Sequence, residues 1–170
     1  NIDLLDGCFR RDEVSNKDLY ATFSQGTIAG EGAAMFLVSD TAHNAVATID
    51  AVQTIHTSDE QEVKHTLQQF IQNYIPAGEK ADLLISGENG DNRLLKYYAA
   101  AESLFDEHTA IARFKHMCGE YATASSVAVW LACHSHLPTH TIKRGTQAGH
   151  FRNIIICNNY RERQHGFILI

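Results

Sequence analysis

Three groups of residues in this sequence carry side chains that could do chemistry. The first is the junction Lys115-x-x-x-Gly119-Glu120, which joins a β-prone run at residues 111–114 to a segment of small and apolar residues at 122–133. The second is a short cluster of Cys133, His134, His136 and His140. The third is basic and comprises Lys143, Arg144, Arg161 and Arg163.

The cysteine and histidine cluster does not predict a metal site. Thiolate and imidazole ligands suit Zn²⁺, but neighbouring positions at a helix end point in different directions, and no second pair has zinc-finger spacing. The pattern Gly87-x-x-Gly90 is likewise too short for a dinucleotide fingerprint. We therefore expect neither a metal nor a cofactor. The basic residues predict either an ordinary solvated edge or a patch for an acidic partner.

The segment at 122–133 is the element around which we expect the chain to be organised. It is apolar on every side and rich in alanine and serine. A helix that is apolar all round must be buried, and its small residues let neighbouring backbones approach closely. We predict a central buried helix behind the strand at 111–114.

The remaining elements follow from hydrophobic periodicity and from turn residues. Residues 1–18 form an irregular lead-in. Strands are predicted at 19–23, 35–38, 46–55, 81–85, 111–114, 152–157 and 166–170, and helices at 58–74 and 92–105, the first with an N-cap and capping box at 58–61. This order predicts one α/β domain over residues 1–170, with a mixed sheet of about five strands and helices on both faces.

Composition narrows the possible functions. The chain has 170 residues, 44% of them hydrophobic, which is enough for one domain with a real core. Its 14 Lys and Arg against 20 Asp and Glu give a net charge of −6, which argues against nucleic acid or an anionic membrane as partner. No apolar run is long enough to span a bilayer. Four cysteines without paired spacing predict reduced thiols, and hence a cytoplasmic location.

Two motifs resemble the β-ketoacyl-acyl carrier protein synthases, which are condensing enzymes of the thiolase fold. The junction at Lys115 resembles the Lys-x-x-x-Gly-His junction of that family, with Glu120 at the position of a catalytic histidine. Residues 30–38, Gly-Glu-Gly-Ala-Ala followed by an apolar run, resemble the family's GEGA segment and its strand. The predicted order of elements also resembles the C-terminal half of a thiolase-like fold.

The resemblance implies a degraded catalytic set. Ser86 stands where the family has its other histidine, and charged residues at 158–164 replace a glycine-rich loop beside the acyl site. The family's nucleophilic cysteine belongs to a region upstream of the GEGA segment, which this sequence does not include. Neither Ser86 nor an ionised Glu120 can stabilise an enolate as an imidazole does. Lys115, Glu120 and Ser86 are thus family-matched catalytic positions, and we expect a Lys115–Glu120 ion pair in place of catalysis.

The resemblance therefore implies a β-ketoacyl synthase-like protein of fatty acid or polyketide acyl chain elongation. As part of an active enzyme it would be a condensing acyltransferase, but we expect the isolated chain to be inactive. It would act like a chain-length factor or as the C-terminal half of a longer synthase. The implied partners are acyl carrier protein and either an N-terminal ketosynthase half or a second copy, which would cover a wide apolar face. The alternative is a thiolase-fold interaction module without an acyl ligand.

Overall fold

A computed structural model describes residues 7–10, 15–134, 137–145 and 150–170. Within them the chain forms an α/β domain built on one mixed sheet in the order β1-β6-β5-β2-β3-β4. The strands are β1 (Ala51–His56), β2 (Leu83–Ser86), β3 (Ala110–Arg113), β4 (Ile142–Arg144), β5 (Ile154–Tyr160) and β6 (Gln164–Leu169). The α/β class and the mixed sheet are confirmed. The sheet has one strand more than expected, because the three-residue strand β4 pairs along the free edge of β3.

The strand directions place the three central strands in parallel. β2 pairs in parallel with both β3 and β5, whereas β6 runs antiparallel to β5 and to β1. Parallel neighbours need crossover connections, and these carry α2 (Leu95–Glu102) between β2 and β3 and α4 (Ser125–Ala132) between β3 and β5. The carboxyl ends of β2, β3 and β5 therefore meet at one edge of the sheet.

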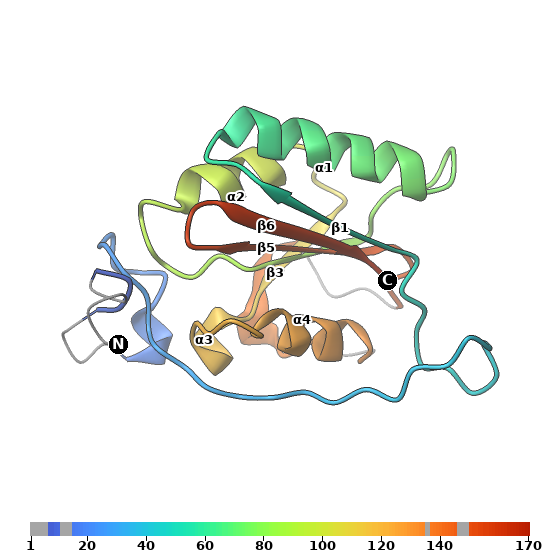
Figure 1. Ribbon diagram of the computed structural model, residues 1–170, viewed down its shortest axis with the longest axis horizontal. Coiled ribbons are helices and arrows are strands. Elements are labelled where there is room, and N and C mark those ends of the chain that lie inside the picture. Colours follow the sequence, from blue (N-terminus) through green and yellow to red (C-terminus); the bar gives the residue numbers. More distant parts are fainter. Residues whose placement is uncertain (1–6, 11–14, 135–136, 146–149) are drawn as a thin grey trace.

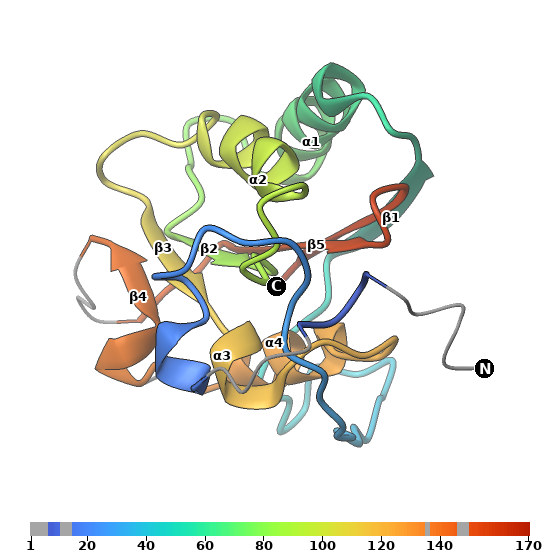
Figure 2. The same cartoon turned by 90° about the vertical axis from the view of Figure 1, so that its left-hand side faces the viewer.

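Helices cover both faces of the sheet, as the sequence predicts (Figure 1). On one face, α1 (Glu60–Tyr74) and α2 share a core with the outer strands that includes Val63, Leu67, Phe70, Tyr98 and Phe167. On the other, α3 (Lys115–Cys118) and α4 pack on Ile85, Phe114 and Ile156. Figure 2 shows the sheet edge-on between these two layers.

Helix α1 begins one residue later than its sequence signal suggests. Asp59 is the N-cap, and its side chain accepts the backbone N–H of Gln61 at 2.8 Å, whereas Ser58 precedes the cap. Glu60 and Glu62 follow in the first turn, where carboxylates are favourable next to the positive end of the helix dipole. The helix ends at Tyr74, before Pro76, because proline cannot continue the hydrogen-bond ladder.

Helix α4 is shorter and less enclosed than predicted. It covers Ser125–Ala132 instead of 122–133, and its buried side is formed by Ala128, Val129, Leu131 and Ala132. Trp130 is 48% exposed, so the helix is not buried on all sides. The physical reason is that α4 lies against one sheet face only, and no described layer covers its outer side.

The strands predicted at 19–23 and 35–38 are wrong. Residues 16–18 form a short 3-10 helix that ends in turns at 19–22, and residues 30–39 are extended without pairing to any described strand. Apolar content was misleading here, because Phe23, Met35 and Leu37 are strongly exposed and contribute nothing to the core. Part of the irregular lead-in, residues 1–6 and 11–14, lies outside the described residues.

Candidate functional site

The candidate site lies where the carboxyl ends of β2, β3 and β5 meet. Ser86 is the last residue of β2, Lys115 follows β3 after Phe114, and Asn158 lies near the end of β5. In open α/β sheets this edge is where ligands bind, because loops from neighbouring strands converge there. The three family-matched positions predicted from the sequence all reach this edge.

A close crossing of two glycines positions Glu120. The chain at Gly30 passes directly over Gly119, and a Cβ atom on Gly119 would lie 2.6 Å from the Gly30 Cα. Two backbone hydrogen bonds fix the crossing, from Gly30 N–H to the Glu120 carbonyl at 3.2 Å and from Glu120 N–H to the Ile28 carbonyl at 2.9 Å. Gly119 also has a φ of +71°, which side chains disfavour. The GEGA segment and the Lys115 junction are therefore in direct contact.

The ion pair expected between Lys115 and Glu120 is present. The Lys115 Nζ lies 2.5 Å from the Glu120 Oε1, and the Lys115 side chain is completely buried. The Glu120 Oε2 accepts a hydrogen bond from the Asn89 Nδ2 at 2.9 Å. Both carboxylate oxygens thus have a donor, which a buried carboxylate requires. Lys115 and Glu120 therefore form a buried ion pair in which the two charges neutralise each other.

Ser86 does not join this cluster. Its hydroxyl accepts the backbone N–H of Glu88 at 3.3 Å, so it shapes the turn after β2, and no hydrogen bond from it to Lys115 or Glu120 occurs in the described chain. The side chain that reaches Glu120 from this turn is Asn89, which is 3% exposed. Sequence reasoning missed Asn89. Its position between Gly87 and Gly90 marked a turn but not the direction of its side chain.

A second buried carboxylate lies in the same turn. Glu88 is 5% exposed and accepts from the Arg113 guanidinium at 3.1 Å and the Lys143 Nζ at 2.5 Å. Lys143 also binds Glu102, while Arg113 lies over the Tyr20 ring at 3.6 Å from its centroid. This network joins β3, β4 and α2, and it was invisible from the sequence because its members are dispersed along the chain.

The basic residues grouped in the sequence do not form one free patch. Lys143 is bound to two carboxylates, and the Arg144 guanidinium donates to the carbonyls of Phe105 and Asp106. Arg161 lies over the ring of Tyr160, at 5.2 Å from its centroid, in the turn between β5 and β6. Three of the four are therefore engaged by groups of the domain itself.

The β5–β6 turn keeps a backbone shape suited to glycine. Arg161 and Glu162 have φ values of 52° and 66°, in the left-handed region that side chains rarely adopt. This turn falls within the segment where the resemblance places a glycine-rich loop. The charged side chains of Arg161 and Glu162 therefore project from a turn whose conformation glycine would adopt without strain.

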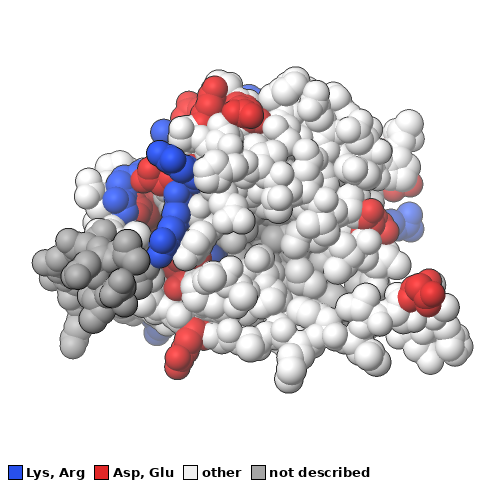
Figure 3. All heavy atoms as spheres, viewed as in Figure 1, with Lys and Arg blue, Asp and Glu red and all other residues white. Residues whose placement is uncertain are grey.

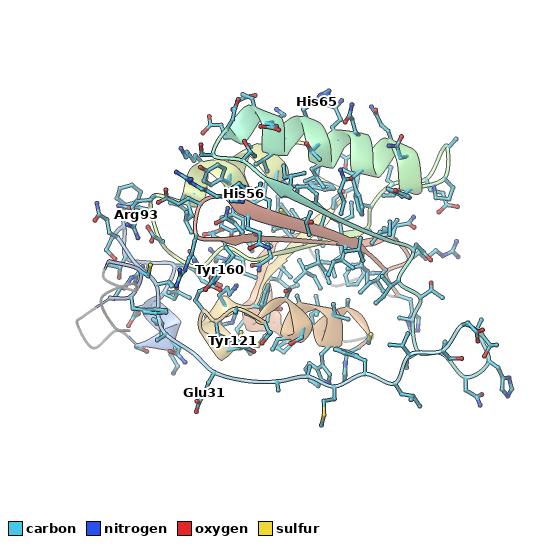
Figure 4. All side chains as sticks on the ribbon, in the orientation of Figure 1. Glu31, His56, His65, Arg93, Tyr121 and Tyr160 are labelled. Carbon is cyan, nitrogen blue, oxygen red and sulfur yellow. The ribbon has the colours of Figure 1, made fainter. Side chains whose placement is uncertain are left out.

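A cavity of about 230 Å³ opens between this turn and the glycine crossing. Its walls are mostly apolar and include Phe9, Leu94, Tyr121 and Tyr160, and the carboxylates of Glu120 and Asp91 also line it. Asp91 is paired with Arg93 at 2.5 Å. Burial opposes the charged form of Asp91, but the Arg93 guanidinium and backbone N–H outweigh it and lower its pKa. Tyr121, Tyr160 and Arg93 lie at the same end of the molecule (Figure 4).

Burial dominates the other titratable groups near the cluster. It raises the pKa of the Tyr98 hydroxyl well above its usual value, with the Glu120 carboxylate adding to the effect. It also raises the pKa of the Cys118 thiol, which the nearby Lys115 ammonium opposes. Neither group is therefore prepared to act as a base or nucleophile at neutral pH.

The cysteine and histidine cluster is dispersed in space. His134 lies against the Trp130 ring, with the ring centroids 4.0 Å apart, whereas His140 contacts His116 at 5.2 Å. His136 lies outside the described residues. The part of the chain that the structure describes holds no group of three or more His, Cys, Asp or Glu side chains placed to bind a metal ion.

Comparison of the chain with protein-family models, with curated proteins and with solved structures found no match. In the described part of the chain, no helix has the length and apolar character needed to cross a membrane.

Proposed function

We propose that this chain is a β-ketoacyl synthase-like protein of acyl chain elongation whose own catalytic positions are inactive. The observation that carries the proposal is the buried Lys115–Glu120 pair, at the junction that resembles the condensing enzymes. An ionised carboxylate that is already neutralised by an internal ammonium cannot supply the positive charge or N–H donors that stabilise an enolate. Under this proposal the ion pair stands where the resemblance places the catalytic histidine that stabilises the enolate.

Two further features support the thiolase-like assignment. The mixed sheet, in which β6 runs antiparallel to both of its neighbours, is compatible with the layered α/β fold that the resemblance implies. The two motifs that resemble the condensing enzymes, the GEGA segment and the Lys115 junction, are also in direct contact, where Gly30 crosses Gly119. Under this proposal the chain acts by pairing with an active ketosynthase, as a chain-length factor does, or completes a longer synthase in the cytoplasm. Acyl carrier protein delivers the acyl group to that assembly.

The alternative function is that of a thiolase-fold interaction module without an acyl ligand. The observation that favours it is the pair of charged side chains, Arg161 and Glu162, beside the cavity. A desolvated charge next to an alkyl chain is unfavourable, so these residues reduce the affinity for an acyl group.

Two measurements test the proposal. Purified chain should release no CO₂ from malonyl-carrier protein under conditions in which an active ketosynthase does, because the imidazole donors are replaced. It should nevertheless bind octanoyl-carrier protein more tightly than the unacylated carrier, as followed by fluorescence anisotropy. CO₂ release would refute the inactive assignment. Equal binding of both carriers would favour the interaction module.

A further inference from the structure

The cavity between the β5–β6 turn and the glycine crossing has room for one small molecule. Its volume of about 230 Å³ equals the liquid volume of about eight water molecules. Phe9, Leu94 and Tyr160 give it apolar and aromatic walls. Five charged side chains of the described chain also line it, namely Asp91, Arg93, Glu120, Arg161 and Glu162. A ligand that fits these walls needs an apolar body, and the charged side chains decide which polar groups it carries.

Three of these five charges are neutralised inside the domain. The Glu120 Oε1 lies 2.5 Å from the Nζ of Lys115, which is completely buried. The Asp91 carboxylate lies 2.5 Å from the Arg93 guanidinium, which also donates to the Gly7 carbonyl at 2.7 Å. Each of these charges therefore has a partner of opposite sign within the fold, and none of the three needs a ligand.

The other two, Arg161 and Glu162, form no salt bridge with each other or with any other residue that the structure describes. Both are exposed at the rim of the cavity. The Arg161 guanidinium lies over the Tyr160 ring, at 5.2 Å from its centroid, and this contact leaves the N–H groups along the guanidinium edge for a carboxylate. Figure 3 shows basic and acidic side chains gathered at the left-hand end of the molecule, where Figure 1 places the β5–β6 turn.

The backbone of the turn holds these two side chains at the rim. Arg161 and Glu162 have φ values of 52° and 66°, and the Glu162 N–H donates to the Asn159 Oδ1 at 3.1 Å, which fixes the turn. Left-handed backbone at residues other than glycine is strained, and such strain clusters at ligand sites. The rim therefore presents a cation and an anion from two neighbouring residues, in front of an apolar interior.

We propose that this cavity binds a free α-amino acid with a large apolar side chain. Its carboxylate would pair with Arg161, its ammonium with Glu162, and its side chain would lie among Phe9, Leu94 and Tyr160. An α-amino acid carries both charges on one carbon atom, which matches two opposite charges on neighbouring residues. A ligand with only one of the charges leaves either Arg161 or Glu162 without a partner. The inference goes beyond the proposed function and does not depend on it, because neither decarboxylation nor carrier protein is involved.

Isothermal titration calorimetry on the full chain tests the amino-acid site. L-Phenylalanine should bind, whereas 3-phenylpropionate, which lacks the ammonium, and phenethylamine, which lacks the carboxylate, should each bind about 10-fold more weakly or worse. This ratio corresponds to the loss of one hydrogen-bonded charged group. Glycine should not bind measurably, because it has no side chain for the apolar walls.

Two variants separate the two charges. Arg161→Gln should weaken L-phenylalanine about 10-fold and leave phenethylamine unchanged, because phenethylamine has no carboxylate to lose its partner. Glu162→Gln should weaken L-phenylalanine by a similar factor and leave 3-phenylpropionate unchanged. The matched controls are Arg163→Gln, on the same turn but outside the cavity lining, and Glu107→Gln, which is distant in sequence. All four side chains are exposed, so the variants should keep the wild-type melting temperature.

Three results would overturn the inference. The first is no binding of L-phenylalanine up to about 10 mM, where a millimolar Kd is detected. The second is equal affinity for L-phenylalanine, 3-phenylpropionate and phenethylamine. The third is an effect of Arg163→Gln as large as that of Arg161→Gln. Binding of octanoyl-carrier protein without binding of L-phenylalanine would remove this inference alone. Binding of L-phenylalanine by a chain that releases CO₂ would support this inference and refute the inactive assignment.

Discussion

Replacing Lys115 by methionine should destabilise the domain by about 3–5 kcal/mol, because it leaves the Glu120 carboxylate buried without a cation. The Lys115 side chain is completely buried and its Nζ is 2.5 Å from the Glu120 Oε1, so water cannot replace the lost ammonium without opening the core. Only the hydrogen bond from Asn89 would remain. For a domain of this size the loss corresponds to a fall of roughly 10 °C in melting temperature.

A double-mutant cycle separates the pair from simple packing effects. Glu120→Gln keeps an acceptor for Asn89 but leaves the Lys115 ammonium facing a neutral amide. The double variant Lys115→Met with Glu120→Gln removes both charges and should be more stable than Lys115→Met alone. The coupling free energy from urea unfolding should be about 2 kcal/mol or more. Additivity within about 0.5 kcal/mol would mean that the two residues do not stabilise each other.

The pH dependence provides an independent check on the same variant. The loss of stability in Lys115→Met should be larger at neutral than at acid pH, because a stranded carboxyl can take up a proton in acid and lose its charge. Melting curves of the wild type and the variant across this range measure the difference. An equal loss at both ends would contradict the stranded charge.

Three further predictions concern the local backbone and one histidine. Glu162→Gly should stabilise the domain by about 1 kcal/mol in thermal melts, because glycine adopts the positive φ without strain; a destabilised variant would refute this. Gly30→Ala should cost about 3 kcal/mol or more, because its Cβ would collide with the Cys118 carbonyl at the crossing, whereas Gly78→Ala, with open space around it, should cost less. Burial, with His140 and Arg113 nearby, lowers the pKa of His116 to about 4. Because the unfolded chain takes up this proton from about pH 6.5, the free energy of unfolding should fall as the pH drops from 6.5 to 4. His116→Gln should flatten that fall, whereas the control His65→Gln should not.

The regular elements were predictable where periodicity and turn residues agreed. Helix α1 has both an acidic N-cap region and apolar residues at helical spacing, and its bounds differ from the prediction by only a residue or two at its start. The buried strands β2, β3 and β5 lie within or beside short apolar runs, which is typical of strands covered on both faces. Local sequence determined these elements.

The errors have a common physical origin. Residues 35–38 have the composition of a strand, but pairing depends on a neighbouring backbone, which composition does not encode. Helix α4 has the composition of an enclosed helix, but its outer face has no described layer above it. β4 was too short to give a periodic signal. In each case the element depends on what lies next to it in space.

The site was predictable only in part. Lys115 and Glu120 lie close in sequence, so their contact followed from the expected junction. Asn89 and Glu88 lie in the turn after β2, whereas their partners come from distant segments: Arg113 ends β3 and Lys143 lies in β4. These contacts follow from the order of the strands in the sheet, and a pattern within a single sequence does not show that order.

The position of β6 has a consequence for how the chain folds during synthesis. β6 is the strand that joins β1 to the rest of the sheet, and β5, which precedes it, is the neighbour through which β6 reaches β2. Residues 51–56 are therefore made more than a hundred residues before residues 164–169, their partners in the sheet. While the ribosome is still adding the last strands, β1 has no partner strand, and α1 can bury Val63, Leu67 and Phe70 only in part, against the earlier elements α2, β2 and β3. Closure of the sheet awaits release of residues 154–169, so folding of this domain is late, non-local and dependent on protection of the nascent chain from aggregation.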